Sequence, residues 1–450
     1  MVAQSNQQSV RLFVPIDDTW SRGLPPQHLP GAAWFLNLIH WKWICWRADD
    51  DGFVRLKSDY LRRVISRSSL SEIRTVLADA GIIDWDRFYI QGCRSMRYRL
   101  REPYQRTRVM DCTDSKLCRK IRKLQRATEQ ELLPVHRWLR GRLTSLEFDI
   151  QRAESIISGM FPDADSPLEP DEYRNRLLEQ AQSLDDQLCF GTPELTVCRF
   201  GRVHTATTRL PASLRRCLAF NGQHLVGIDL SNSQPLFAGL AAVDHCSSRS
   251  KKERLRKFSP PVSNLYGRLR TPTTPSPPHS QPPPITMAEK SQTVFSKGSY
   301  ESCLCDKPDL KEYLIECEQG DFYESLMLPG EERSWIKRRV LIDSFYGEGC
   351  YTSPIQERFD AQYPTVAGML ADLKTHDHRR PSWIMQTRES TMFIGQICRR
   401  IMVEKPDIPL ATIHDSFLTT EQHADYVHAV GMAEFTRLRV TPTFKRETYD

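Results

Sequence analysis

The chain has 450 residues, 40% hydrophobic and 26% charged, which is typical of a soluble protein with roughly two to four domains. Its 62 basic and 56 acidic residues give a net charge of only +6, so total charge excludes a strongly polycationic or polyanionic protein. Thirteen cysteines without zinc-like spacing, and no run approaching about 18 apolar residues, predict a cytoplasmic protein with reduced thiols and no membrane span.

The first third of the chain begins with residues 1–30, whose Pro and Gln content predicts a flexible arm. From 31 to 110 the pattern predicts three helices followed by a pair of strands, with Ser69 and Glu72 spaced as a capping box. This order resembles the winged-helix domains of plasmid and phage replication proteins. In those domains the second helix of the helix-turn-helix enters the major groove of DNA. Arg74 on that helix is a candidate DNA contact, although small helix-hairpin modules also serve as plain protein contacts.

Residues 111–185 are predicted to form a helical connector or thumb-like region, because Leu, Ile and Trp recur at spacings of three and four. Between Arg87 and Arg126 there are 13 Lys or Arg residues against 3 Asp or Glu residues. This excess suits contacts with phosphates, and a solvated helix face is the alternative. Nine prolines between Pro260 and Pro284 predict that residues 247–300 form a disordered basic insertion.

Two aspartates, 186 positions apart, follow short apolar runs rich in β-branched residues. Asp229 ends Leu-Val-Gly-Ile-Asp, and Asp415 ends Leu-Ala-Thr-Ile-His-Asp, so each is predicted at the tip of a strand. Two neighbouring strands would bring the carboxylates together, and Mg²⁺ binds through one or two carboxylates plus substrate phosphates. The pair therefore predicts phosphoryl or nucleotidyl transfer, against the alternative that each is a turn residue or helix cap.

Basic and aromatic residues accompany these strands. Arg202, Thr205 and Arg215 precede the Asp229 strand and are candidates for binding template or primer phosphates. A helix predicted over 333–346 includes cations that could bind a triphosphate and aromatic rings that could stack near a base; they are Lys337, Arg338, Phe345 and Tyr346. A further helix begins near Gln386 and runs to the Asp415 strand.

The order of these motifs resembles the palm and fingers of family A DNA polymerases and of the related phage-type single-subunit RNA polymerases. The resemblance covers about residues 186–440 without the insertion, and rests on Gly201-Arg202, Asp229-Leu230-Ser231, Lys337-Arg338 with Tyr346-Gly347, the Gln386 helix and His414-Asp415. It implies an α+β fold with an antiparallel palm sheet and helical fingers. The first part of the palm would span 186–246, and the fingers with the rest of the palm 301–450.

The resemblance also implies site residues and ligands. Asp229 and Asp415 match the two metal-binding carboxylates, with the Leu230 carbonyl as a further ligand for two Mg²⁺ ions, or Mn²⁺ in their place. Lys337 or Arg338 matches the triphosphate-binding cation. The other matched positions would contact the nucleotide, through Gln234 and Tyr346, or the primer-template, through Gln386 and His414.

Two departures leave the substrate open. Gln234 stands five positions after Asp229, where the DNA polymerases have a Glu that helps exclude the ribose 2′-hydroxyl, and Ser416 follows Asp415, as in the RNA polymerases. The expected function is a DNA-directed DNA polymerase acting on a primer-template with nucleoside triphosphates in replication, such as that of a mobile element or phage. The alternatives are an RNA polymerase or primase with the same metal site, and a DNA-binding replication initiator without turnover.

Overall fold

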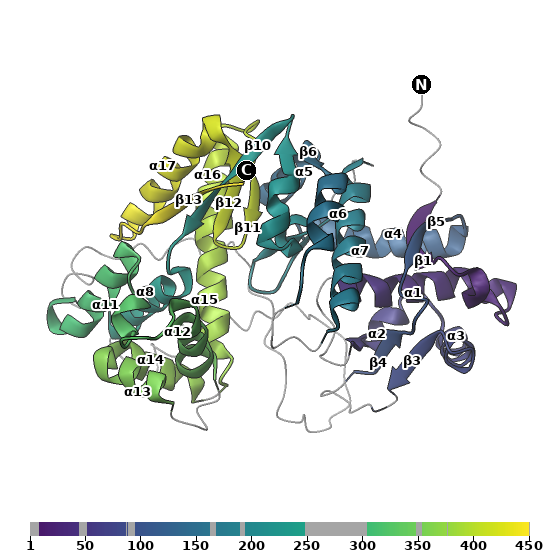
Figure 1. Cartoon of the computed structure of the whole chain (residues 1–450), viewed down its shortest axis with the longest axis horizontal. Coiled ribbons are helices and arrows are strands. Elements are labelled where there is room, and N and C mark those ends of the chain that lie inside the picture. The colour runs from purple at the N-terminus through teal and green to yellow at the C-terminus, as the bar shows by residue number, and fades with distance from the viewer. Residues whose placement is uncertain are drawn as a thin grey trace, which may run out of the picture.

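The computed structural model describes residues 9–44, 52–86, 88, 95–162, 168–189, 194–247, 304–347, 353–375 and 377–449. Figure 1 shows an N-terminal body on one side and a larger body of helices around a sheet on the other. The fold is a mixture of helices and antiparallel sheets, as predicted. The predicted insertion at 247–300 lies outside the described residues, apart from its first residue at the end of a helix.

The N-terminal body packs three helices against two small sheets. The helices are α1 (Leu29–Ile44), α2 (Ser58–Leu61) and α3 (Arg67–Asp79). The first sheet has the strand order β2 (Val54–Arg55), β4 (Arg97–Leu100), β3 (Ile83–Asp86), and the second pairs β1 (Val10–Pro15) with β5 (Thr107–Cys112). Their apolar sides share one core, in which Phe35 and Tyr98 meet edge to face.

Two expectations for this body are wrong. The flexible arm expected over 1–30 contains the strand β1 from Val10 to Pro15, which pairs along its whole length with β5 and buries Leu12 and Val14. The helix cap expected at Ser69 lies three residues earlier, since the Ser66 side chain accepts a hydrogen bond from the Ser69 backbone at 3.2 Å. Glu72 instead contacts His28 at 2.9 Å.

The connector is mainly helical, as predicted, but it also adds a strand to the large sheet. Its helices are α4 (Ser115–Gln130), α5 (Pro134–Leu143), α6 (Ile150–Ser158) and α7 (Pro170–Cys189), and its strand is β6 (Leu146–Phe148). Helix α7 fixes the N-terminal body, because Arg176 and Gln180 donate to the last backbone carbonyls of α1 at 2.8 and 2.9 Å. These bonds join the two bodies at a buried interface.

The large sheet has the order β11-β12-β10-β9-β6, with β13 on the free edge of β10. All of its pairs are antiparallel. Alternate residues of β10 face the main core, namely Val226, Ile228 and Leu230, which leaves Asp229 on the other face. The remaining strands are β9 (Leu218–Phe220), β10 (Gln223–Leu230), β11 (Ala411–Ile413), β12 (Ser416–Thr420) and β13 (Phe444–Thr448), with a separate hairpin of β7 (Leu195–Val197) and β8 (Val203–Thr205).

Helices surround the main core beside this sheet, in green and yellow in Figure 1. Two of the helical stretches are π-helices, a rare form that is frequent at functional sites. In chain order these elements are α8 (Ser233–Ser247), α11 (Pro308–Gln319), α12 (Arg333–Arg339), the π-helix η7 (Val340–Tyr346), α13 (Pro354–Gln362), α14 (Pro364–Lys374), α15 (Arg380–Ser390), the π-helix η8 (Thr391–Cys398), α16 (Arg399–Glu404) and α17 (Glu421–Arg437).

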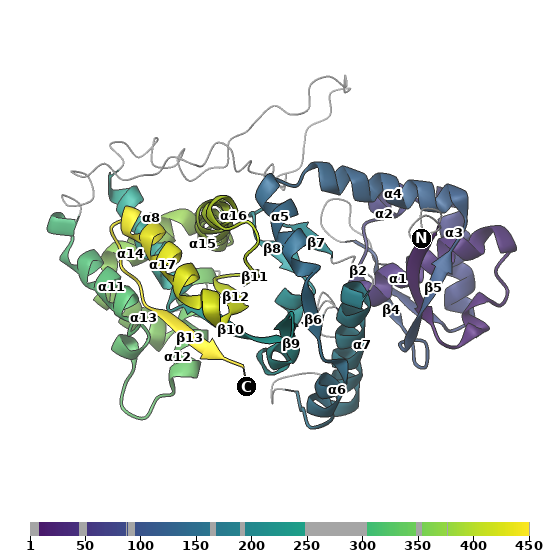
Figure 2. The same cartoon turned by 90° about the horizontal axis from the view of Figure 1, so that it is seen from above.

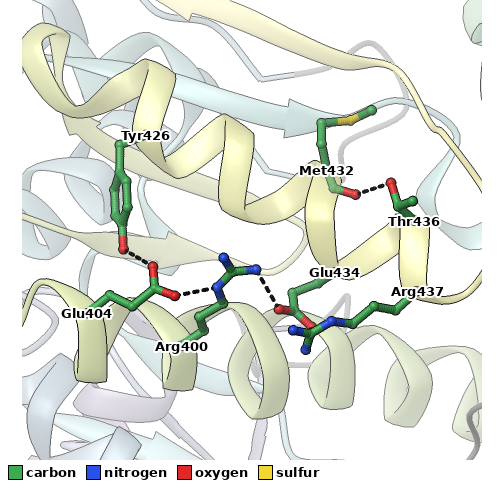
Figure 3. A network of polar contacts seen from close by, with 7 residues as sticks. All are labelled: Arg400, Glu404, Tyr426, Met432, Glu434, Thr436 and Arg437. Atoms are coloured by element: carbon green, nitrogen blue, oxygen red, sulfur yellow. Dashed lines mark hydrogen bonds and ion pairs between the residues drawn. The ribbon is translucent and has the colours of Figure 1, made fainter.

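A polar network fixes α16 to α17 (Figure 3). Arg400 donates to Glu404 at 2.6 Å and to Glu434 at 3.1 Å, and Tyr426 donates to Glu404 at 2.8 Å. Glu434 is only 3% exposed and is also contacted by Arg437 at 2.8 Å. Because α16 continues α15 and η8, this network holds the long helix that leads to Asp415.

Replacement of Arg400 by Met is expected to lower the free energy of unfolding by about 1–2 kcal/mol, because Glu434 loses one of its two cationic partners in a buried position. The neighbouring exposed Arg399 makes no hydrogen bond or ion pair with any described residue, so Arg399→Met is the matched control. Urea unfolding measures both variants. Equal stabilities would contradict a holding role for the network.

Candidate active site

The two predicted aspartates lie near one another, Asp229 on β10 and Asp415 in the turn just before the neighbouring strand β12. Asp229 is the penultimate residue of β10, and its register partner on β12 is Ser416, the residue after Asp415. The Leu230 backbone N–H donates to the Asp415 carbonyl at 3.2 Å, which ties the end of β10 to the turn before β12. Opposed residues of antiparallel strands have Cα atoms about 4.5–5.5 Å apart. The two acids therefore lie close together, at the same end of β10 and β12.

The electrostatics confirm that the carboxylates interact. The pKa of Asp229 is raised to about 7, first by burial, then by the negative charges of Asp415 and Glu447. The cations of Lys337 and Arg215 act in the opposite direction and lower this pKa. Two acids that repel one another, with cations facing them, form a site that gains stability from a bound positive ion.

Two tight turns border the aspartates. His414, in the turn between β11 and β12, has a φ of 53°, and Asn232, just after β10, has the same φ. Left-handed backbone costs a residue with a side chain roughly 1–2 kcal/mol, so both turns are held by their surroundings. His414 meets the His204 ring edge to face at 5.8 Å, and burial lowers its pKa, helped by the charge of Arg202. The imidazole is therefore neutral at pH 7.

Unpartnered polar atoms cluster around the same turns. Buried side-chain oxygens of Ser231, Asn232, Ser233 and Ser416 have no hydrogen-bond partner among the described residues. A buried polar atom without a partner costs about 1–3 kcal/mol, so such atoms mark a place where a ligand or water completes the bonding. Their position beside two carboxylates fits a hard divalent cation and its water shell. No group of three or more His, Cys, Asp or Glu side chains suited to a metal occurs in the described part of the chain.

A buried hydrogen-bonded network lies next to the aspartates. The Tyr346 hydroxyl donates to the Gln234 carbonyl oxygen at 2.7 Å, and the Gln234 amide donates to Glu389. Arg202 donates to the same Glu389 oxygen at 2.6 Å. Glu389 is 1% exposed, and its pKa is raised to about 7 by burial and by the charge of Asp415, against the lowering effect of Arg202. Segments from four parts of the chain meet in this network.

The structure distinguishes the two candidate cations of α12. Both Lys337 and Arg338 are exposed, and the charge of Lys337 is among those that lower the pKa of Asp229. The helix expected over 333–346 is not regular along its whole length, because it widens to a π-helix from Val340. Phe345 is buried, whereas Ile342 is 47% exposed. The wider turn also directs Tyr346 to Gln234.

Three predicted residues lie apart from this site or inside the protein. Thr205 is buried and bonds to Thr207 at 2.7 Å, which is a local turn contact. Gln386 donates to Ser382 at 2.8 Å within its own helix. Arg74 is 7% exposed, with its guanidinium between two rings, 5.6 Å from Trp85 and 5.2 Å from Tyr98. That position argues against the DNA contact that the sequence suggests for Arg74.

Two acidic residues at the site were not among the predicted residues. Glu389 has no local sequence signal, because its partners are distant in the chain. Glu447 lies on β13, where Lys445 is the register partner of Asp229 and Glu447 that of Gly227, so both face the aspartate side of the sheet. The Tyr449 hydroxyl donates to Glu447 at 3.0 Å. In the sequence, the alternating pattern Lys-Arg-Glu-Thr-Tyr over 445–449 is the signal that could have indicated a strand with Glu447 on one face.

None of the helices in the described ranges is long and apolar enough to cross a membrane. No protein-family model and no curated protein matches this sequence. Among solved structures, the chain is similar to the POL domain of Pol1 from M. smegmatis, determined in complex with a DNA primer-template and dNTP. The similarity has 10% identity and a TM-score of 0.31, and it covers 75% of this chain and 73% of that chain. It is coarse and assigns no residue of this chain.

Proposed function

We propose that this chain is a template-directed nucleotidyltransferase, and specifically a DNA-directed DNA polymerase of the family A type. The observation that supports the proposal most is the pair of aspartates, one near the end of β10 and one in the turn before its antiparallel neighbour β12, with the charge of Asp415 raising the pKa of Asp229. Sites for phosphoryl displacement commonly use such a pair to hold two metal ions about 3.5–4 Å apart.

Asp229, Asp415 and the carbonyl of Leu230 are the residues that would hold Mg²⁺, and the neighbouring unpartnered serine and asparagine oxygens would bond to its waters. When bound, Mg²⁺ supplies charge to stabilise the phosphates and lowers the pKa of the attacking hydroxyl. The two carboxylates orient the reacting groups from one edge of the sheet. Neutral His414 beside them adds no positive charge there.

The remaining residues divide between the triphosphate, the sugar and the nucleic acid. Lys337 faces Asp229 from α12 and is placed to neutralise the triphosphate, which makes it the better candidate than Arg338. Gln234 and Tyr346 are hydrogen-bonded to each other and would border the nucleotide. The charge of Arg215 also lowers the pKa of Asp229, and Arg215 is a candidate contact for primer phosphate.

The test is extension of a labelled primer-template with Mg²⁺, supplying dNTPs or NTPs separately, beside Asp415→Asn. Asp407→Asn is the matched control, because the Asp407 side chain is 97% exposed. Extension with dNTPs that only Asp415→Asn abolishes is the expected result. Tight duplex binding without extension by either nucleotide set would favour a replication initiator instead.

An RNA polymerase or primase is the second candidate. Gln234 is neutral and uses its amide group toward Glu389 and its carbonyl toward Tyr346, so it supplies no charge near a sugar. Ser416 follows the second aspartate with its hydroxyl unpartnered among the described residues. Extension with NTPs alone in the same assay would support this candidate.

A further inference from the structure

Helix α4 is the rigid link between the two bodies. One side of it packs into the N-terminal core through Leu117, Cys118 and Ile121. Helix α5 begins after three intervening residues and packs into the main core, to which its residues Val135 and Leu139 belong. Figure 2 shows α4 extending along one edge of the molecule from the N-terminal body toward α5. The side of α4 that faces away from this core is exposed.

The exposed side of α4 is a row of cations without counter-charges among the described residues. Lys116, Arg119, Lys123 and Arg126 are all exposed and follow the spacing i, i+3, i+7 and i+10, which places them on one helix face. None of the four makes a hydrogen bond or ion pair with another described residue. We name these four residues the α4 row.

The neighbouring charged residues do not neutralise the α4 row. Lys120 donates to the Val64 carbonyl at 2.8 Å, and Arg122 donates to the Ser9 carbonyl at 3.2 Å, so both are turned toward the N-terminal body. Glu129, near the end of the helix, is bound by Arg140 at 2.5 Å. Like charges three or four residues apart each destabilise a helix by about 0.2–0.5 kcal/mol. The row therefore destabilises α4 through repulsion between like charges. A bound polyanion would relieve this repulsion.

The dimensions of the row match a nucleic-acid backbone. From Lys116 to Arg126 the helix rises about 15 Å at 1.5 Å per residue. Double-stranded DNA has a phosphate on each strand about every 3.4 Å of its helix axis, so about 15 Å of that axis carries about four phosphates of one strand. Contacts from lysine and arginine to phosphates carry no sequence information, so a row that meets the DNA backbone would bind independently of sequence.

We propose that the α4 row is a duplex-binding surface that contacts the DNA backbone between the N-terminal body and the sheet with the two aspartates. A membrane surface is disfavoured, because interfacial helices insert large apolar side chains, and α4 exposes none of the large hydrophobic residues that are exposed elsewhere in the described chain. The proposal adds a binding surface to the proposed function and does not depend on turnover.

The test measures binding of the full chain to two unrelated 30-base-pair duplexes by fluorescence anisotropy at several salt concentrations. The test variant replaces Lys116 and Lys123 with Gln, and a second replaces all four residues of the row. The matched control replaces Lys307 and Lys311 with Gln, two exposed lysines at and just inside the start of α11, far from α4 in both views. Circular dichroism and thermal unfolding check that all variants remain folded.

The expected result is weaker binding to both duplexes, by about tenfold for the double variant and about a hundredfold or more for the fourfold variant at low salt, with the control unchanged. The slope of log K against log salt is expected to become shallower by about 0.9 for each phosphate that the row no longer neutralises. Unchanged affinity and slope would overturn the proposal. So would weaker binding to only one duplex, or binding of the row to phosphatidylserine vesicles while duplex binding stays unchanged. Binding is measured without nucleotides, so failure of the proposed catalysis is distinguishable from failure of duplex binding.

Discussion

Asp229→Asn is expected to reduce primer extension by at least about 10³-fold and, at the same time, to make the metal-free chain more stable at pH 8. The first effect follows from loss of one of the two carboxylates that would hold Mg²⁺. The second follows from the raised pKa of Asp229, since the folded chain resists the charged form that burial and Asp415 disfavour. Asn keeps the shape of the side chain and removes that charge.

The sign of the pH dependence is fixed by the direction of the shift. The folded pKa of Asp229 is about 7, above its ordinary value of 3.8, so between these values the folded chain binds more protons than the unfolded chain. The free energy of unfolding therefore falls as pH rises from about 4 to about 7, because ionised Asp229 is disfavoured in the folded chain. Because Asp229 is partly exposed, solvent reduces the effect to on the order of 2 kcal/mol at pH 8.

Thermal unfolding of wild type and Asp229→Asn between pH 4 and 8, without divalent ions, measures this difference. The two curves should coincide near pH 4 and separate as pH rises, with Asp407→Asn following wild type throughout. Adding Mg²⁺ should raise the unfolding temperature of wild type and leave Asp229→Asn unchanged. Equal stabilities at pH 8 would mean that Asp229 is hydrated and ionised as an ordinary surface acid.

The sequence was sufficient for the elements whose signals are local. The strands that end in Asp229 and in the turn of Asp415 were predicted from short apolar runs, but they are not direct neighbours, because β12, which follows Asp415, lies between β11 and β10. The sequence did not show which of Lys337 and Arg338 is the triphosphate-binding cation. Their position relative to Tyr346 was predicted for a regular helix, whereas a π-helix begins at Val340 and lies between them and Tyr346. A π-helix has no simple sequence pattern, since it depends on how the helix packs against the core.

Long-range contacts explain the other differences. Thr205 and Arg74 have residue types common at nucleic-acid sites, but packing buries both, and only the folded chain shows this. Glu389 lies three positions after Gln386 and still carries no sequence signal, because its importance comes from Arg202 and Gln234, which are 187 and 155 residues away. Sequence patterns report periodicity along the chain and not the pairing of distant side chains.

Glu389→Ala is expected to lower the free energy of unfolding by about 3 kcal/mol, because it leaves the Arg202 guanidinium partly buried without its carboxylate. The same change removes the acceptor for the Gln234 amide. Above its pKa of about 7, Glu389 is ionised and only accepts hydrogen bonds, so it fixes which way the Gln234 amide points, with the Gln234 carbonyl toward Tyr346. Glu389 is therefore a positioning residue for both neighbours.

Glu389→Gln is the matched control for the positioning role, because it keeps the shape and a carbonyl oxygen. Arg202 and the Gln234 amide donate to the same Glu389 oxygen, so a Gln carbonyl in that position accepts from both and keeps the direction of the Gln234 amide. The expected decrease in stability is smaller than for Ala, and the preference between dNTPs and NTPs stays close to that of wild type, whereas Glu389→Ala changes it by about tenfold, equivalent to one hydrogen bond of about 1.4 kcal/mol. Single-nucleotide incorporation with each sugar measures this preference.

A double replacement decides whether Arg202 and Glu389 act as a pair. Removing one member leaves the other unpaired in a buried position, whereas replacing both with apolar residues removes the unpaired charge. Arg202→Met combined with Glu389→Leu should therefore be more stable than either single variant, although Gln234 then lacks its acceptor and sugar preference stays altered. Strictly additive decreases in stability in this cycle would show that the two side chains are independent, and the positioning of Gln234 by Glu389 would need another cause.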